Sequence, residues 1–594
     1  MPGLVGFTTG KTKSTSADCA LERMRSLITH FDSYVEDQLF SDGSVCCSGA
    51  RLDVLKPLPR PYFESGIYIW VDGEIFNANE FIIDVKAPAK ADTALARIAM
   101  DGMKPADLSR IDGIYNAVVY NSATGKVHLV SDRYGYRRLY WSIHNGELAW
   151  ASEVKAFLGL HGYRPVLSEE SLYEFLEIGY MLGDHTWFDG VKVLEPGSVL
   201  TWDTRERTWS MESYWFWDKI TTSVDRIDED EAAVELGRLF RRAVEKRSTD
   251  PKSPVVFLSG GLDSRAILAA IPYSGAGIHT MTFGKRGSDD LRIASRASAV
   301  KGATHCTCYI DEENWLLPRV AAVWYTDGML DLLNMHGIEA LPMMMSRFDF
   351  QLNGFAGDLV LGGSYIGTKT LMDSVNRKAV AAWMGCPEDA LWDFDRFEVL
   401  SKADYYYLHN RVRRFTYEGL KMSGVFMEFR IPFFDNELIE FVYSFPDTYR
   451  YKAKLYKRML LREFPEYFKR IPWQKTGAPI GWPNLLQDSV LLARKASRKL
   501  ASRTGKSLWL SDSWGYSDYP KWMRCEPARS FLENVLRDKN ALYPDFVPRL
   551  QVEMTLDEHM AGLDRSDSLL RYLTVELWLK QVDEGRCMEP GEFK

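Results

Sequence analysis

The stretch VVFLSGGLDSRAILAAI, residues 255–271, constrains the fold more than any other part of the chain. It changes from an apolar strand pattern, through small residues, to a helical pattern. A strand that ends in small residues and restarts as a helix presents main-chain N–H groups to an anion. The pattern therefore predicts a strand, a phosphate-binding turn and a helix in succession.

The residues after 233 alternate between strand and helix patterns. Apolar segments at 254–258, 278–283 and 305–310 read as strands, and 289–302 reads as a helix. This alternation predicts a parallel, doubly wound sheet. Ligands in such sheets bind beyond the carboxyl ends of the strands, so the turn lies at the expected crevice.

The first 215 residues have a different character. Short segments alternate apolar and polar residues and turn at Asp-Gly, Ala-Thr-Gly and Asn-Gly, which predicts antiparallel hairpins. We therefore predict an α/β protein with an N-terminal domain over 1–215, a polar linker over 216–235 and a second domain over 236–594. A chain of 594 residues is long enough for two cores.

Composition excludes several classes of function. The net charge of −8 argues against a general nucleic-acid binder, and no apolar run reaches the length of a membrane span. The arginines at 411, 413 and 414 read as a solvated or ion-paired helix face. The eight cysteines include no CxxC pair, so we expect no disulfide framework, no cysteine-bound metal and a cytoplasmic location.

Two acidic residues in glycine-rich loops indicate a cation at the phosphate site. Asp263 follows Gly260 and Gly261 directly, and a carboxylate beside a phosphate is repulsive unless a cation such as Mg²⁺ bridges them. No lysine follows the glycines, so this is not a Walker motif. The alternative is a connecting turn with Asp263 as a helix cap. The segment 352–364, LNGFAGDLVLGGS, repeats the pattern with Asp358 and weakens that alternative.

The motif SGGLDS at 259–264 resembles the signature of the ATP pyrophosphatases, and the order of motifs resembles the asparagine synthetase family. The matching segments are DGEIFN at 72–77, SDRYGYRRLYW at 131–141, ASEVKAF at 151–157, TFG at 282–284, GSDDLRIA at 287–294, EFRIPFFD at 428–435, KLYKRMLLREFP at 454–465 and PWQKTGAP at 472–479. The resemblance covers about residues 1–480. It implies a glutaminase-like αββα sandwich followed by a doubly wound ATP-pyrophosphatase domain with a helical tail.

The resemblance also implies the cofactors ATP and Mg²⁺ and the roles of particular residues. The nucleotide would be lined by Leu258, Phe283, Asn353 and Gly354. Pyrophosphate and Mg²⁺ would be held by Ser259, Gly260, Gly261, Asp263 and Ser264, with Asp358 as the second metal ligand. Lys475 would stabilise the acyl-adenylate, a role that suits a fixed cation aimed at developing negative charge. Lys457 would contact phosphate more weakly, if it is not simply on an exposed helix face.

The N-terminal domain departs from its glutamine-dependent relatives. Pro2 stands where a nucleophilic cysteine follows the initiator methionine, and Asp72 stands where an amide side chain is usual. A carboxylate there would oppose an oxyanion. We therefore expect no glutamine hydrolysis. The domain would be structural, or would shape a pocket for another nucleophile.

Without an ammonia source, the leading hypothesis is an ATP-dependent, AMP-forming amide ligase that passes an adenylated carboxylate to an intramolecular or tethered amine. Members similar to this are the β-lactam synthetases and lasso-peptide macrolactam cyclases of natural-product biosynthesis. Phe355 and Leu359 replace usual acidic residues and suit a bulkier or less charged acid than aspartate. The substrate would be a small molecule or peptide carrying both groups, with a precursor-processing protein as a conceivable partner.

Two alternatives remain. One is an asparagine synthetase-like enzyme that uses free ammonia on aspartate or a sugar acid. The other is a catalytically silent scaffold, which the intact Asp263, Asp358 and Lys475 disfavour.

Amide formation also needs a base near the amine. The segment 404–411, DYYYLHNR, offers Asp404 and Tyr406, and equally Tyr405, Tyr407 and His409. The alternative for each is a side chain in a packed aromatic helix.

Overall fold

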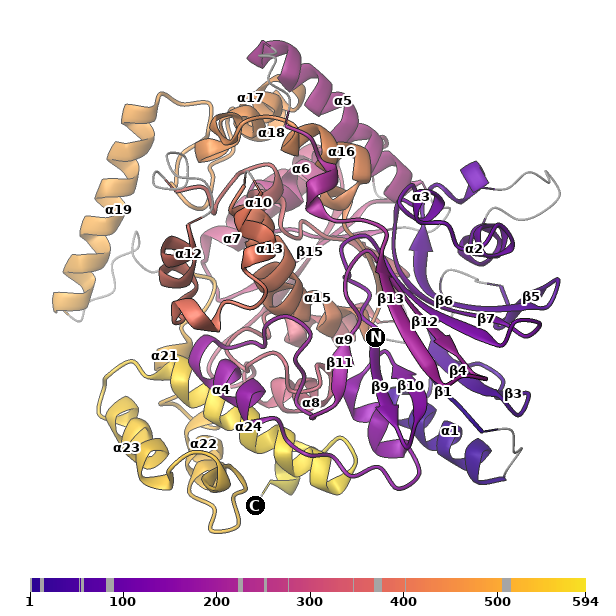
Figure 1. The fold of residues 1–594 in the computed structure, drawn as a ribbon. Coiled ribbons are helices and arrows are strands. Elements are labelled where there is room, and N and C mark those ends of the chain that lie inside the picture. The colour runs from indigo at the N-terminus through magenta and orange to yellow at the C-terminus, as the bar shows by residue number, and fades with distance from the viewer. Residues whose placement is uncertain are drawn as a thin grey trace.

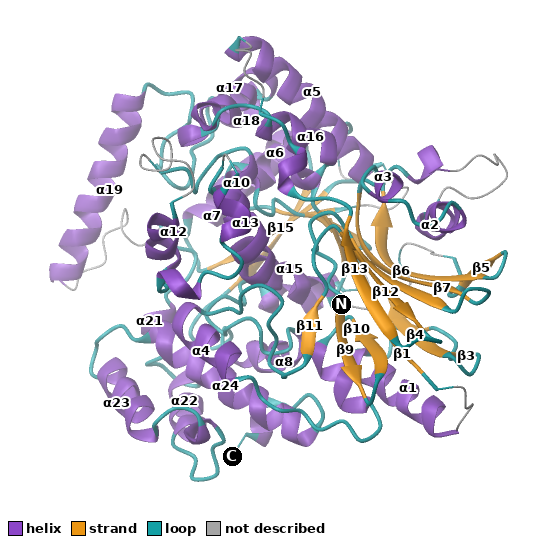
Figure 2. Ribbon diagram, viewed as in Figure 1, coloured by secondary structure: helices purple, strands orange, loops and turns teal. Residues whose placement is uncertain are grey.

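The computed structural model describes residues 3–10, 15–52, 54, 58–81, 90–222, 228–249, 254–275, 277–345, 347–367, 376–400, 402–504 and 514–593. Three β-sheets organise this part of the chain (Figures 1 and 2). Two are antiparallel and belong to the first 215 residues, and the third is parallel and follows them. None of the described helices combines the length and the apolar character needed to cross a membrane.

The first antiparallel sheet runs through the N-terminal strand β1. In spatial order its strands are β11 (Val191–Val193), β9 (Tyr140–His144), β10 (Glu147–Ala151), β1 (Gly3–Thr8), β4 (Val45–Arg51) and β2 (Val35–Glu36), with β3 (Phe40–Ser41) also paired to β4. Asn145 and Gly146 join β9 to β10 and have φ of 52° and 73°. A two-residue hairpin turn of type I′ needs positive φ at both positions, which Asn and Gly adopt most easily.

The second antiparallel sheet faces the first. Its order is β13 (Thr208–Ser213), β12 (Ser198–Asp203), β8 (Lys126–Ser131), β7 (Gly113–Asn121), β6 (Ile67–Ile75) and β5 (Tyr62–Glu64). A buried cluster that includes Trp70, Trp150 and Trp202 draws on both sheets. Helix α1 (Thr15–Ile28) packs on the first sheet and α2 (Ala91–Met100) on the second. This is the predicted αββα sandwich.

The parallel sheet carries the strand on which the phosphate turn was predicted. Its order is β16 (Thr304–Tyr309), β15 (His279–Gly284), β14 (Val255–Phe257), β17 (Phe350–Leu352) and β18 (Glu428–Arg430). All four strand pairs are parallel. The doubly wound prediction is therefore confirmed, with the turn on the central strand.

Helices make up most of the rest of the chain. Helices α6 (Asp263–Ala270), α7 (Asp289–Lys301) and α15 (Tyr417–Gly424) contact strands of the parallel sheet. The other helices of this half, before the tail, include α5 (Glu229–Ser248), α8 (Leu317–Tyr325), α10 (Gly357–Val360), α14 (Asp404–Tyr407), α16 (Asn436–Tyr443), α17 (Lys454–Glu463) and α18 (Pro465–Phe468). A π-helix at Leu408–Thr416 joins α14 to α15. The tail contains α19 (Asn484–Thr504), which projects from the body in Figure 1, then α22 (Ala528–Leu536), α23 (Arg549–Met560) and α24 (Ser566–Glu584).

The predicted linker is partly helical. Asp228 caps α5 by accepting from the main-chain N–H groups of Asp230 and Glu231, so the helix begins inside the segment expected to be a linker. Ala232 and Ala233 are buried, because the helix packs its apolar face from its first turns onward. Residues 223–227 lie outside the described part of the chain.

Two of the three clustered arginines are buried, which corrects the solvated face expected for them. Arg413 donates to the carbonyl oxygen of Gly183 at 3.0 Å, and Arg414 donates to that of Met181 at 3.1 Å. Both are at most 2% exposed. They tie the π-helix to the N-terminal part of the chain, since buried guanidinium groups need acceptors.

Candidate active site

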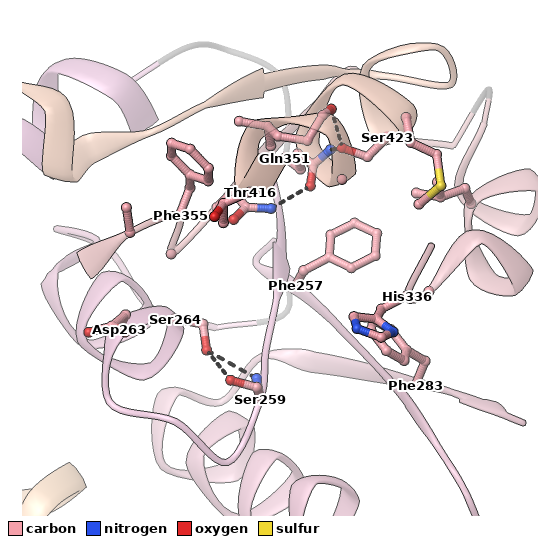
Figure 3. Close-up of a pocket in the computed structure, with 18 of the residues that line it drawn as sticks. Phe257, Ser259, Asp263, Ser264, Phe283, His336, Gln351, Phe355, Thr416 and Ser423 are labelled. Carbon is pink, nitrogen blue, oxygen red and sulfur yellow. Dashed lines mark hydrogen bonds between the residues drawn. The ribbon is translucent and has the colours of Figure 1, made fainter. Parts of the chain in front are cut away.

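A cavity of about 420 Å³ opens beyond the carboxyl ends of β14 and β17 (Figure 3). The predicted residues that line it are Leu258, Ser259, Asp263, Ser264, Phe283, Asn353 and Gly354. Other lining residues come from the segment after α8, from the end of the π-helix and from α15: Leu330, Asn334, His336, Phe415, Thr416, Gly419, Leu420, Met422 and Ser423. The cavity thus brings together elements far apart in the sequence.

The turn after β14 is held by its own serines. The hydroxyl of Ser264 accepts from the main-chain N–H of Ser259 at 3.0 Å, and the two hydroxyl oxygens lie 3.1 Å apart. Leu262 precedes α6 and provides no side-chain cap to its first turn. The first-turn N–H groups of a helix lack intrahelical partners, so they suit a phosphate oxygen.

Gly260 is required for a different reason from the one predicted. A Cβ at this position would lie 2.7 Å from the Cβ of Gln474 and 3.2 Å from a carboxylate oxygen of Asp290. Its N–H donates to Asp290 at 2.8 Å and so is already occupied. The missing side chain lets the segment before Lys475 pack on the turn, whereas Gly261 meets only the Ser259 hydroxyl within 4 Å.

The second glycine-rich loop packs on the first turn of α6. A Cβ on Gly354 would lie 2.8 Å from the Ser264 nitrogen, and one on Gly357 would lie 2.8 Å from the carboxyl carbon of Asp263. These glycines let Asp358, at the start of α10, approach Asp263. Burial and, second to it, the negative charge of Asp358 together raise the pKa of Asp263 to about 8.

This pair of carboxylates fits a divalent cation. Both are hard oxygen donors, and a cation between them would offset both the cost of burying the Asp263 charge and its repulsion by Asp358. The hydroxyl of Tyr456, on α17, donates to Asp263 at 2.9 Å and fixes the orientation of that carboxylate.

Lys475 lies in a segment fastened to the phosphate turn. The main-chain N–H of Gln474 donates to the carbonyl oxygen of Gly260 at 3.1 Å. Arg265, buried in α6, donates to the carbonyl oxygens of Ile471 and Pro472 at 3.3 and 3.0 Å. Lys475 itself is exposed and does not line the cavity.

Two ammonium groups share one indole beside the turn. The Nζ atoms of Lys475 and Lys457 lie 5.5 and 5.1 Å from the centre of the Trp473 ring. Burial lowers the pKa of Lys457, and the charge of Lys475 lowers it further. The pair places positive charge on the segment that packs on the turn.

The structure contradicts the role of base predicted for Asp404 and Tyr406. The carboxylate of Asp404 is 3% exposed and pairs with Arg450, and it accepts from Tyr443 at 3.0 Å. The hydroxyl of Tyr406 donates to the carbonyl oxygen of Trp392 at 3.2 Å. Neither lines the cavity.

The neighbouring candidates for the base do not line the cavity either. Tyr405, Tyr407 and His409 are all buried, and burial holds the pKa of His409 well below its usual range. The packed aromatic helix, which was the alternative interpretation, is what the structure contains. Among the described residues that line the cavity, the ionisable side chains are those of Asp263 and His336.

Several site residues were not predicted. Tyr456 and Asp290 hold the turn, and Gln351 and Ser423 form part of the cavity wall. Tyr456 and Asp290 lie inside motifs at 454–465 and 287–294, so the motifs marked their neighbourhood. The pairing of Gln351 with Ser423 spans 72 positions and leaves no local signal.

The N-terminal sandwich has its own cavity of about 180 Å³, lined by Asp72, Arg51, Arg60, Asp92 and Glu428 among others. Arg137 donates to a carboxylate oxygen of Asp72 at 2.6 Å and also pairs with Glu428 of β18. The charge at position 72 is thus matched by a buried arginine that spans the two domains. Pro2 lies outside the described residues.

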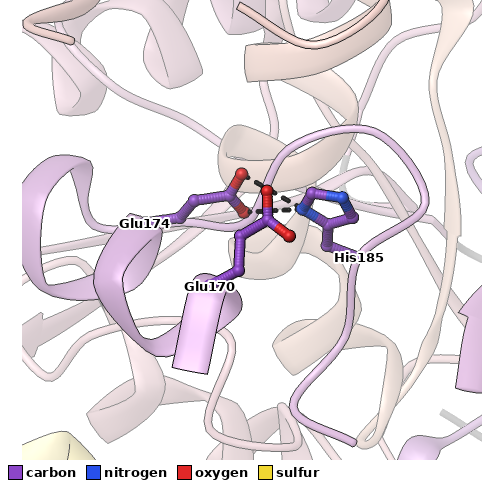
Figure 4. A group of neighbouring side chains, drawn as sticks. All are labelled: Glu170, Glu174 and His185. Carbon is purple, nitrogen blue, oxygen red and sulfur yellow. Dashed lines mark hydrogen bonds and ion pairs between the residues drawn. The ribbon is translucent and has the colours of Figure 1, made fainter. Parts of the chain in front are cut away.

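A second cluster of ionisable groups lies on α4 (Glu169–Ile178) and the loop after it (Figure 4). Oxygens of Glu170 and Glu174 and a nitrogen of His185 lie within 4.8 Å of one another. The Nδ1 of His185 is 3.1 Å from Glu174, and this hydrogen bond raises the pKa of the imidazole. This hydrogen bond explains why Glu174 and His185 lie together.

The fold and the site define a two-domain α/β protein in which an amidotransferase-type sandwich is joined to a parallel sheet carrying a phosphate turn. Residues 1–215 match the family model of the glutamine amidotransferase domain, and residues 235–468 match that of asparagine synthase. The chain belongs to the asparagine synthetase family.

Individual relatives are distant. Amidase chry2 of Gibberella zeae is 25% identical over 351 residues, which cover 54% of this chain and 51% of the amidase. The chain therefore spans about half the length of that relative. The glutamine-hydrolysing asparagine synthetase 3 of Bacillus subtilis is 22% identical over 555 residues, covering 81% of this chain and 88% of the synthetase. A solved structure of the allosteric regulatory enzyme of purine biosynthesis is 13% identical, covers 53% of this chain and 81% of its own, and has a TM-score of 0.26.

Proposed function

We propose that this chain is an ATP-dependent, AMP-forming amide ligase that adenylates a carboxylate and transfers the acyl group to an intramolecular or tethered amine. One observation carries the proposal. The segment before Lys475 is fastened to the phosphate turn by the bond from Gln474 to Gly260, and the loop that carries Asp358 packs against Asp263 at the end of the same turn. Asp263 and the serines of the turn line one cavity, and the segment that carries Lys475 is fastened to the same turn outside it.

In the first step, a carboxylate oxygen of the substrate attacks the α-phosphorus of ATP. The bond from that phosphorus to the bridging oxygen breaks, and pyrophosphate leaves with the electron pair. The first-turn N–H groups of α6 and the Ser259 hydroxyl would bind the departing phosphates. Asp263 and Asp358 would hold Mg²⁺, which when bound neutralises charge on the pyrophosphate. Lys475 would close over the α-phosphate from its position on Trp473.

In the second step, the amine nitrogen attacks the acyl carbon, the carbon–oxygen bond to AMP breaks and the nitrogen loses one proton to water. Holding the amine beside the adenylate supplies rate through proximity. The apolar wall of the cavity would exclude water and so limit hydrolysis of the adenylate. No residue of this chain is assigned as the base.

The N-terminal sandwich supports an amine that does not come from glutamine. The Asp72 carboxylate is paired with Arg137, so the position offers no neutral amide to an oxyanion. Burial raises the pKa of both Cys46 and Cys47 and makes these thiols poor nucleophiles. The substrate class that follows is a small molecule or peptide that carries its own amine, as in lactam or macrolactam formation in natural-product pathways. A precursor-processing protein would be a fitting partner, and the cytoplasm, where ATP is made, a fitting location.

The test uses ATP labelled at the α-phosphate and a candidate amino acid or peptide that carries both groups. The proposal expects labelled AMP in a one-to-one ratio with the amide product and no labelled ADP. Labelled ADP would show cleavage at the γ-phosphate and overturn the proposal. AMP that forms only with aspartate and ammonium would replace it with the asparagine synthetase-like reaction, and the absence of any nucleotide turnover would favour the scaffold.

A further inference from the structure

We propose that the part of the acyl substrate next to the reacting carboxyl group is uncharged and apolar, and that Phe355 is a specificity-determining residue that selects it. The inference rests on the proposed function, because it concerns the acid that is adenylated. Aspartate, which carries further charges, would then be a poor substrate.

The walls beyond the phosphate turn are apolar. Figure 3 shows Phe355 and Thr416 on the side of the cavity above Asp263, and Phe283 and His336 on the opposite side of Phe257. If Phe283 lines the nucleotide base, the acid occupies the side with Phe355. The other apolar groups that line the cavity include Phe415, Leu330, Leu420 and Met422.

No described residue that lines the cavity is an arginine or a lysine. The ionisable side chains there are Asp263, which faces the cation site, and His336. The imidazole of His336 stacks on Tyr519 while part of it stays exposed, and desolvation and the charge of Arg319 lower its pKa, so it is neutral near pH 7. A second carboxylate on the substrate, held against the wall, would lose its hydration and find no cationic side chain among the described lining residues.

Three polar groups of the wall, on Asn353, Gln351 and Ser423, are neutral and already bonded to one another. Asn353 donates to the side-chain oxygen of Gln351 at 3.0 Å, and Gln351 donates to the hydroxyl of Ser423 at 2.7 Å. That hydroxyl donates in turn to the carbonyl oxygen of Leu420 at 2.8 Å. This series of hydrogen bonds presents dipoles to a substrate but no net charge.

The ring of Phe355 is held in place from both domains. Tyr136, from the N-terminal sandwich, meets it edge-on with ring centres 5.2 Å apart, and Phe434 lies 5.7 Å away. The ring is 7% exposed and so has little freedom to withdraw. The sandwich thus shapes the acid side of the cavity by supporting Phe355.

The experiment measures binding of two non-reactive adenylate analogues by isothermal titration calorimetry. Both are 5′-O-sulfamoyladenosines, one N-acylated with 4-methylpentanoate and the other with succinate. The two acyl chains have the same shape, but the first ends in two methyl groups and the second in a carboxylate. We expect the apolar analogue to bind at least about 30-fold more tightly, because the carboxylate is desolvated without a partner.

Two variants make the result specific. Thr416→Lys places a cation on the exposed side of the wall and should reduce the preference at least about tenfold, through pairing with the succinyl carboxylate. Phe355→Leu keeps the wall apolar and should retain the preference for the uncharged chain, while improving binding of a bulkier phenylpropionyl analogue.

The outcomes separate the two claims. Equal binding of the analogues, or tighter binding of the succinyl analogue by the natural chain, overturns the inference and leaves the ligase intact. A Thr416→Lys variant that keeps the same preference for the apolar analogue also overturns the inference, because the charge of the wall would then not determine which acid binds. Failure of both analogues and of ATP itself to bind contradicts the proposed function as well.

Discussion

The main-chain N–H of Gln474 donates to the carbonyl oxygen of Gly260 across 3.1 Å, and this bond joins the segment that carries Lys475 to the phosphate turn. A side chain at position 260 would collide with Gln474, so the glycine and the contact require each other. The bond fixes the chain next to Lys475 while the lysine side chain stays exposed and free to move.

Replacing Lys475 should damage the chemical steps more than nucleotide binding. Lys475→Met removes a cation from the place where negative charge develops, which typically costs about 3 kcal/mol, or about a hundredfold in rate. The dissociation constant for ATP should stay within about threefold, since the turn and the carboxylates still bind the phosphates. Lys495→Met, an exposed lysine of α19, is the matched control. Normal turnover by Lys475→Met would make this lysine a surface residue without a role.

Tyr456 should tune the affinity for Mg²⁺. Tyr456→Phe removes the hydrogen bond to Asp263 and leaves the carboxylate free to turn away from the cation site. A lost hydrogen bond to a charged group costs about 1.5 kcal/mol, so the Mg²⁺ concentration that gives half-maximal activity should rise about tenfold. Tyr467→Phe, on the next helix, should leave that concentration unchanged. If the two variants need the same Mg²⁺ concentration, Tyr456 does not position a metal ligand.

The phosphate turn was predictable because strand, turn and helix are local and follow from residue types within 255–271. The second loop was found for the same reason. The role of base was predicted wrongly. Asp404 and Tyr406 are engaged by Arg450 and Trp392, which lie 46 and 14 positions away, and such tertiary contacts leave no local pattern. Gly260 was predicted to help hold pyrophosphate. The structure adds a second reason for the glycine, because Gln474, more than 200 positions later, packs where a side chain at position 260 would lie. Patterns within one element identify such residues, whereas partners that meet only in the fold are not visible in a single sequence.

Glutamine should not be hydrolysed by the purified protein. The sandwich offers a carboxylate paired with Arg137 at position 72, and the thiols of Cys46 and Cys47 are buried. A coupled assay with glutamate dehydrogenase should find no glutamate above the level of a blank without protein. Release of glutamate that a reactive glutamine analogue abolishes would show that the sandwich retains a nucleophile.

His128 should make the protein less stable in mild acid. Burial lowers the pKa of this imidazole to about 4, and Lys126 adds to the effect. Because the folded pKa lies below the unfolded value, the unfolded chain binds the proton first, and the free energy of unfolding falls as the pH drops from 6.5 toward 4. At pH 5.5 the loss amounts to about 1 kcal/mol.

Urea denaturation at pH 7.5 and pH 5.5 checks this for His128→Gln, since glutamine cannot be protonated. The natural chain should lose more stability between the two pH values than the variant does. His161→Gln, an exposed position, is the control and should behave like the natural chain. Identical losses in all three proteins would show that His128 is not held neutral by the fold.

ATP–pyrophosphate exchange with the Asp263→Asn variant tests the central claim most directly. Asparagine has nearly the same shape, so the turn and the hydrogen-bonded wall of the cavity remain, but one of the two carboxylates that meet at the cation site is gone. A thermal unfolding curve that matches the natural chain confirms that the fold is intact. With an acid that supports exchange in the natural chain, the account predicts that Asp263→Asn exchanges no pyrophosphate above background. Exchange at the natural rate in that variant would contradict the account, because adenylation would then proceed without the carboxylate on which the site is built.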